Sequence, residues 1–364
     1  MAVTATLMPE AARYETVGTP LLWAASLVVL VVLLALDFLI TRRPHEVRMR
    51  EALLWSAFYV ALPLVFWLYL WWDFGTTQAV EFLTGYVVEK SLSVDNLFVF
   101  MLLLSAFAVP PRLQQRVLLY GIIGALVLRG IFIALGAAML YAFDWTFLVF
   151  GAILVATAVK IFRDALSGEV REVDVSRMRS VRLLRRLMPV TDDYRGPEMT
   201  VREGGRRALT PLALVVVAVF VTDVVFAVDS VPAVFGITED PFLVFTTNAF
   251  ALLGLRALYF VLQGAVSKLA HLDYGLALIL AFIGVKLALH WAHDIWPVVP
   301  DVPTWLSMVV IVLILGIVTM TSLWANRLRT AEQVLPATAE AAAGDPPGAQ
   351  HPRSRRRGPR STGR

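Results

Sequence analysis

The sequence predicts an all-α, polytopic membrane protein with about nine transmembrane helices. Apolar residues make up 58% of the 364 residues and charged residues only 16%, and the mean hydropathy is +0.71. A soluble globular protein holds roughly a quarter charged residues, so this composition excludes an ordinary cytosolic enzyme. The apolar residues form runs close to the roughly 20 residues that a transmembrane helix needs. These runs cover about 21–40, 52–72, 91–109, 117–140, 145–163, 209–231, 242–262, 275–291 and 304–325.

The N-terminal part of the chain is expected to contribute a tail and two helices. Residues 1–20 contain Glu10, Glu15 and a single arginine, which is unlike the basic start of a signal peptide. We therefore expect 1–20 to be an extracytoplasmic tail and the first apolar run to be a permanent helix. Residues 21–72 are expected to form two peripheral transmembrane helices, and 304–325 the last one.

The basic residues gather in alternate loops, which predicts the orientation in the cell (inner) membrane. One set of loops carries arginines, including ten in 164–208, whereas the other set carries mainly Asp and Glu. Because cytoplasmic loops are enriched in Lys and Arg, nine spans place the N-terminus outside and the C-terminus in the cytoplasm. The net charge of +4 and the pI near 9.5 therefore reflect topology, and we expect the lipid bilayer and no nucleic acid as a partner.

Two segments are expected to lie outside the membrane on the cytoplasmic side. The Arg-rich loop 164–208 holds apolar residues with helical spacing (Val181, Leu183, Leu184 and Leu187), which predicts an amphipathic helix along the membrane surface. Residues 331–364 are rich in Ala, Pro and Gly and end in a basic cluster. Because this segment has no apolar pattern that could form a core, we expect a disordered basic tail.

Two three-helix units, 76–163 (repeat 1) and 209–291 (repeat 2), carry the same landmarks in the same order. The landmarks are an acid followed by Val-Asp and a small polar residue, then an arginine, then a lysine. They fall at Glu89 to Asn96, Arg129 and Lys160 in repeat 1, and at Asp223 to Ser230, Arg256 and Lys286 in repeat 2. Because three spans is an odd number, the second unit enters the membrane the other way up. This predicts an inverted repeat, an arrangement typical of secondary transporters.

The charged residues inside the predicted spans are the strongest indication of a site. Each costs roughly 2.5–3.5 kcal/mol at a helix centre, so each needs a partner or a function. The acids are clustered on two segments, whereas the bases are spread over four helices. The candidate metal ligands are Glu89, Asp95, Asn96, Asp223, Asp229 and Ser230, and the charge-balancing bases are Arg129, Lys160, Arg256 and Lys286. The alternative is that these charges only form ion pairs between helices.

The shape of the acidic segments also favours a cation site. Residues 80–109 and 209–237 are each near 30 residues long, and Pro232 follows Asp229 by three residues. This predicts broken helices whose free carbonyls complete a coordination shell. The alternative is that Pro232 kinks its helix for packing alone.

Helical geometry separates the polar residues of each segment into two faces. Glu89 and Asn96 are seven residues apart and share a face, while Asp95 is rotated by roughly 100°. Two crossing helices would bring Asp95 and Asp229 together. Carboxylate, amide, hydroxyl and carbonyl oxygens suit Mg²⁺, Ca²⁺ or Mn²⁺, and the same acids can carry protons.

Weaker candidates lie in the last third of the chain. His290, His293 and Asp294 have a spacing compatible with metal capture or with an ordinary interfacial histidine pair. Asn248, with Thr246 and Thr247 before it, either lines a pathway or forms hydrogen bonds between helices. The sequence has no Walker A, G-x-G-x-x-G or H-E-x-x-H motif and no Cys, so we expect neither an enzyme nor a bound cofactor.

At these residues the chain resembles the TerC family of integral membrane proteins, including its Alx-like members. The resemblance covers about 21–325 and is carried by Glu81 to Phe100, Pro189 to Tyr194, Thr222 to Pro232 and Asn248 to Phe260. It implies a fold near the LysE-type transporter superfamily, an association with tellurium resistance, and a role in manganese export. It points to the same six residues, Glu89, Asp95, Asn96, Asp223, Asp229 and Ser230.

The sequence thus favours one function and leaves an alternative. The leading hypothesis is a secondary transporter that exports a divalent metal cation, Mn²⁺ before Ca²⁺, in exchange for protons. The alternative is a non-transporting membrane scaffold or stress-response complex subunit, in which the charges lock helices together and the 164–208 loop binds partners.

Overall fold

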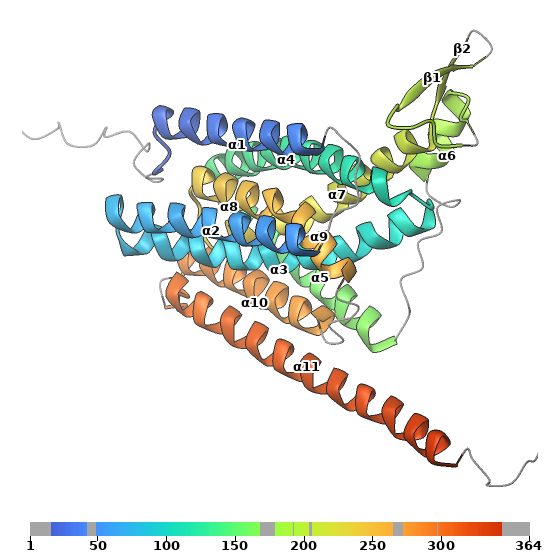
Figure 1. Cartoon of the computed structure of the whole chain (residues 1–364). Helices are drawn as coiled ribbons and strands as arrows, with labels where there is room; N and C mark the ends of the chain where they lie inside the picture. Colours follow the sequence, from blue (N-terminus) through green and yellow to red (C-terminus); the bar gives the residue numbers. More distant parts are fainter. Residues whose placement is uncertain are drawn as a thin grey trace, which may run out of the picture.

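A computed structural model describes residues 16–41, 49–167, 179–191, 193–203, 206–264, 272–296 and 298–343. This part of the chain folds into a bundle of α-helices with one small β-hairpin at its edge (Figure 1). The elements are α1 (Pro20–Thr41), α2 (Met49–Asp73), α3 (Thr76–Ala106), α4 (Pro111–Ala142), α5 (Thr146–Ser167), α6 (Arg179–Leu187), β1 (Thr200–Glu203), β2 (Arg206–Leu209), α7 (Pro211–Phe235), α8 (Pro241–Leu253), α9 (Leu255–Gly264), α10 (Leu272–Ile295) and α11 (Thr304–Ala343). The predicted all-α membrane fold is confirmed.

Within the described residues, eight helical spans are long and apolar enough to cross a membrane, with α8 and α9 counted together. The predicted span at 91–109 is wrong, because α3 begins at Thr76 and ends at Ala106. Its first half contains Glu81, Glu89 and Lys90, which lower the local hydropathy and displaced the expected span toward the C-terminal half. With 31 residues, α3 is also long enough to cross the membrane.

Helix α3 lies at the centre of the bundle. It packs against α2, α7, α8, α9, α10 and α11, while α5 packs along α10 and α4 along α7. In the predicted repeat, α3 corresponds to α7, and α4 corresponds to the α8–α9 span. The contact between α4 and α7 is then matched by the contact between α8 and α3. This pairing is what a two-fold relation would produce, and the inverted repeat itself stays a prediction.

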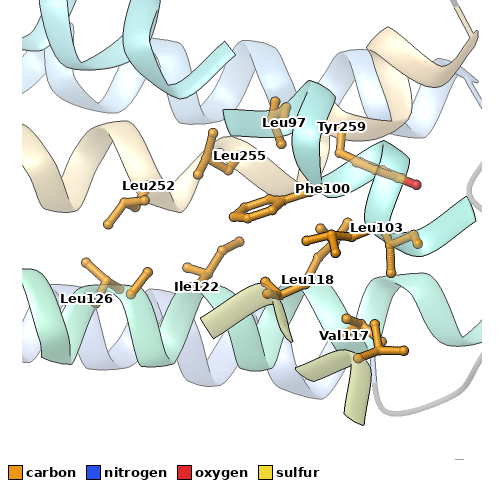
Figure 2. Packing of buried hydrophobic residues seen from close by; sticks show 14 of the residues in the cluster. Leu97, Phe100, Leu103, Val117, Leu118, Ile122, Leu126, Leu252, Leu255 and Tyr259 are labelled. Atoms are coloured by element: carbon orange, nitrogen blue, oxygen red, sulfur yellow. The ribbon is translucent and has the colours of Figure 1, made fainter. Parts of the chain in front are cut away.

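The main apolar cluster joins α3, α4, α8 and α9 on one side of this centre. Leu97 and Phe100 of α3 face Ile122 and Leu126 of α4, with Leu252, Leu255 and Tyr259 from α8 and α9 beside them (Figure 2). All of these side chains are buried. Because lipid is as apolar as these residues, close packing rather than exclusion from water holds the helices together.

The predicted breaks in the two acidic segments are not observed. Helices α3 and α7 are continuous, and Pro232 lies only three residues before the end of α7, where the loss of one backbone donor disturbs little of the helix. The interruption falls instead at Gly254, between α8 and α9. There, Lys90 Nζ donates to the carbonyl oxygen of Ala251 at 3.1 Å.

The Arg-rich loop is folded where the structure describes it. The predicted amphipathic helix is α6, whose Val181 is buried against the core. It is followed by an unpredicted hairpin of β1 and β2, in which Thr200 pairs with Leu209. The hydroxyl of Tyr194 donates to the carbonyl oxygen of Phe107 at 2.7 Å and ties the loop to the end of α3. Burial raises the pKa of Tyr194 to about 12, so this donor keeps its proton at any physiological pH.

The C-terminal segment differs in part from the prediction. Helix α11 continues to Ala343, so residues 331–343, which we expected to be disordered, are helical; their many Ala and Glu residues are strong helix formers. Residues 344–364 and 1–15 lie outside the described residues. The end of α11 extends beyond the bundle at the end where α6 and the hairpin project (Figure 1).

Two glycines bring α5 and α10 into backbone contact. A Cβ atom on Gly151 would lie 2.7 Å from the carbonyl oxygen of Gly284, and one on Gly284 would lie 2.8 Å from that of Gly151. Real Cβ atoms do not approach so closely, so any larger residue must push the two helices apart.

We expect Gly151→Ala to destabilise the protein by about 1–3 kcal/mol, as overpacking of a tight interface does. The measurement is the thermal unfolding midpoint of detergent-purified protein followed by tryptophan fluorescence. Gly316→Ala is the matched control, because nothing lies within 4 Å of its added Cβ atom. Equal midpoints for the two variants would contradict the close approach.

Candidate functional site

The two buried acids of the repeated segments meet at one arginine. Helix α3 contributes Glu89, α7 contributes Asp223 and α4 contributes Arg129, and each side chain is at most 2% exposed. Arg129 Nη1 donates to Glu89 Oε1, and Nη2 lies 3.6 Å from Asp223 Oδ1. The second distance is an ion-pair contact that is too long for a hydrogen bond. Residues from both predicted repeats therefore converge in the centre of the bundle.

Asn248 of α8 completes this group. Its Oδ1 accepts from Arg129 Nη1 at 2.9 Å, and its Nδ2 donates to the carbonyl oxygen of Val244 at 2.9 Å. The hydrogen bond between helices, one of the two alternatives for Asn248, is thus present, and a role in lining a pathway stays a prediction. Ser93 adds a weaker bond, with its hydroxyl 3.4 Å from Glu89 Oε1.

Several buried polar atoms on α3, α7 and α8 lack a hydrogen-bond partner in the described part of the chain. Within the described residues, no hydrogen bond reaches Glu89 Oε2, Asn96 Nδ2, Asp223 Oδ2, Ser230 Oγ or Thr247 Oγ1. Such atoms are rare in native proteins because each costs about 1–3 kcal/mol. Four of the five are oxygens of the kind that coordinate hard cations. Thr247 was grouped with Asn248 from the sequence, and its role in lining a pathway stays a prediction.

The four acids fall into an inner and an outer pair. Glu89 and Asp223 are buried, together with Asn96 and Ser230, as the seven-residue spacing predicts. Asp95 and Asp229 are only partly buried, as their rotation around the helix predicts. Asp229 lies within electrostatic reach of both Glu89 and Arg129. No three His, Asp or Glu side chains in the described ranges are grouped closely enough to hold a metal ion, so the arrangement is one of acids around Arg129.

The other three bases lie elsewhere. Arg256 pairs with Asp37 of α1 and donates to Gln115 Oε1 at 3.3 Å, both buried. Lys160 is exposed on α5. Lys286 is buried and lines a separate cavity with Glu81, Glu239 and Asp301. Of the four predicted charge-balancing bases, Arg129 is therefore the one that contacts the predicted metal ligands. Asp37 was missed, although it is the one acid in the first apolar run.

A polar cavity of about 310 Å³ opens where α3 and α8 begin and α10 ends. On its wall, His290 bridges two loops, with Nε2 3.1 Å from Glu239 Oε1 and Nδ1 3.2 Å from Asp301 Oδ1. His293 contacts the carbonyl oxygen of Val299 instead. The predicted pair of histidines therefore has separate partners, and His290 with its two carboxylates fastens the loops after α7 and α10.

Asp240 anchors the N-terminal segment at this cavity. Its Oδ2 accepts from the backbone N–H of Val17 at 2.6 Å, and its Oδ1 accepts from the Thr16 hydroxyl at 2.7 Å. The same Oδ1 caps the start of α8 by accepting from the N–H of Phe242 at 2.8 Å. Asp240 therefore has a structural role.

Comparison with known proteins agrees with this architecture. The family model of the "Integral membrane protein TerC family" matches residues 74–330. The Alx protein of Escherichia coli K12, whose name gives it a proposed role as a membrane-bound redox modulator, is 46% identical over 75% of this chain and 87% of its own. The same-named protein of Salmonella typhi is 44% identical over 86% of this chain and 98% of its own.

An uncharacterized membrane protein of Myxococcus xanthus is 44% identical over 76% of this chain and 86% of its own length. No solved structure matches the chain. The matched region contains α3 to α10 and with them every residue of the group around Arg129. The chain therefore belongs to the TerC family of integral membrane proteins.

Proposed function

We propose that the protein is a secondary transporter that exports a divalent metal cation, with Mn²⁺ the first candidate and Ca²⁺ the second. The observation that carries this proposal is that Glu89 and Asp223 meet at the centre of the bundle, each with one buried carboxylate oxygen that has no hydrogen-bond partner within the described residues. A site that serves only to hold helices together would satisfy these atoms, because each unsatisfied one lowers stability.

The chemistry of the donor set supports a hard cation. Glu89, Asp223, Ser230 and Thr247 offer carboxylate and hydroxyl oxygens, and Asn248 offers an amide oxygen. Such ligands suit Mn²⁺, Ca²⁺ and Mg²⁺ rather than soft metals. We propose that the partly buried Asp95 and Asp229 pass the ion to the inner acids and carry protons in the opposite direction.

The names of the relatives suggest a second aspect of the same function. The 364 residues include no Cys, so thiol exchange by this chain is excluded. We propose that any influence on cellular redox state follows from the amount of Mn²⁺ in the cytoplasm, because manganese itself changes oxidation state.

Export requires the cell membrane, with the N-terminus outside and the basic loops in the cytoplasm as the charge pattern predicts.

The competing function is a scaffold, and the Arg129 ion pairs are the observation in its favour. We would separate the two with purified protein in liposomes loaded with a Mn²⁺-sensitive dye, under an imposed pH gradient. Transport predicts Mn²⁺ flux in the wild type and its loss in Asp229→Asn, with equal thermal stability. Asp144→Asn in the exposed α4–α5 loop is the matched control and should keep the flux. Absence of Mn²⁺ and Ca²⁺ flux in the wild type under every gradient would reject transport.

A further inference from the structure

The position of Arg129 raises the question of how a cation could bind where a cation already lies. Its guanidinium stands between helices α3, α7 and α8, which carry the proposed ligands, and is 1% exposed. A structural arginine at such a place usually forms two parallel hydrogen bonds with a carboxylate. Here the contacts to both acids use one oxygen each, and Glu89 Oε2 and Asp223 Oδ2 have no partner within the described residues.

The donors of Arg129 are also incompletely used. Nη1 serves both Glu89 and Asn248, while Nε and Nη2 make no hydrogen bond in the described part of the structure. The guanidinium is thus held mainly by charge. Little hydrogen bonding is lost if it moves, provided that another anion receives it.

Asp229 is such an anion. It lies on α7, six residues after Asp223, is only partly buried, and is near enough to Glu89 and Arg129 to interact with their charges. Glu89, Asp223 and Asp229 carry three negative charges and Arg129 one positive charge, which leaves a net charge of −2 when all are ionised. One divalent cation neutralises this group, whereas without the ion the guanidinium compensates one of the two inner charges.

We propose that Arg129 is a tethered cation that competes with the transported metal ion for Glu89 and Asp223. In the metal-free protein the guanidinium occupies these carboxylates, as the structure shows. When a divalent cation enters, Arg129 moves toward Asp229 and the metal takes its place. This inference rests on the proposed function and adds to it a reason why the metal-free carrier buries less uncompensated charge when it returns across the membrane.

The test is equilibrium binding of Mn²⁺ to the purified full-length protein in detergent. The variant Arg129→Gln removes a positive charge within about 4 Å of the site. It should therefore bind Mn²⁺ at least about tenfold more tightly than the wild type. Mn²⁺ flux in liposomes should fall at the same time, because the empty carrier then holds unpaired acids. A double variant, Asp37→Asn with Arg256→Gln, removes the ion pair between the arginine of repeat 2 and α1 and should leave Mn²⁺ affinity within about twofold of the wild type.

If Arg129→Gln does not fold, a second variant can test the same competition. Arg129→Lys retains one charge for Glu89 but is too short to contact Asn248 as well, so it should fold and should tighten binding by a smaller factor. Unchanged or weaker Mn²⁺ binding in a folded Arg129 variant, beside a wild type that binds and transports, would overturn the tethered cation alone. No binding by either protein would overturn the proposed function with it.

Discussion

Replacing Glu89 by Gln is expected to abolish Mn²⁺ transport while leaving a folded protein. Glutamine has the same shape, and its amide oxygen can still accept the hydrogen bond from Arg129 Nη1. The inner group then holds one negative charge, Asp223, and one positive charge, Arg129, so its attraction for a divalent ion is greatly reduced. We expect the free energy of unfolding to change by no more than about 1 kcal/mol, and liposome flux to fall to that of protein-free vesicles.

The control for this prediction is the same change outside the group. Glu51→Gln lies in the first turn of α2, on the periphery of the bundle, and should leave Mn²⁺ flux intact. If Glu89→Gln instead unfolds the protein while flux per folded molecule is unchanged, Glu89 is a structural partner of Arg129. This result would favour the scaffold function over transport. The wild type and both variants are therefore compared at matched amounts of folded protein.

Most transmembrane helices could be predicted from the sequence because their apolar runs are bounded by charges or prolines. The runs at 21–40 and 145–163 end within a few residues of α1 and α5. Helix α3 was misplaced because Glu81, Glu89 and Lys90 lower the hydropathy of its first half. The hairpin of β1 and β2 was missed because strands of four residues show no usable alternation, although Gly204-Gly205 between them is a turn signal.

The site could be predicted in its composition but not in its pairing. Repeated spacing identified Glu89, Asp223 and Arg129, since charges are rare inside membranes and recur here in the same order. Which acid meets which base depends on how helices cross, and no local pattern encodes that. Asn248 reaches the group from α8 through tertiary packing alone.

The two arginines that the repeat relates have different surroundings, and this leads to a second large effect. Asp37→Asn should lower the thermal unfolding midpoint and the amount of protein in the membrane. Asp37 is 4% exposed and pairs with Arg256, while the Tyr59 hydroxyl lies 3.5 Å from its Oδ1. Breaking a buried ion pair from one side leaves the other charge without compensation and costs about 3–5 kcal/mol.

The double variant Asp37→Asn with Arg256→Gln decides whether this effect is structural. It removes both charges and leaves two neutral side chains that can still form a hydrogen bond, so most of the lost stability should return. Mn²⁺ flux per folded molecule should match the wild type, because this pair joins α1 to α9 and contains none of the proposed ligands. Loss of flux in a stable double variant would instead place Asp37 and Arg256 in the transport pathway. Repeat 2 would then have a working site of its own, completed by a helix from outside the repeat.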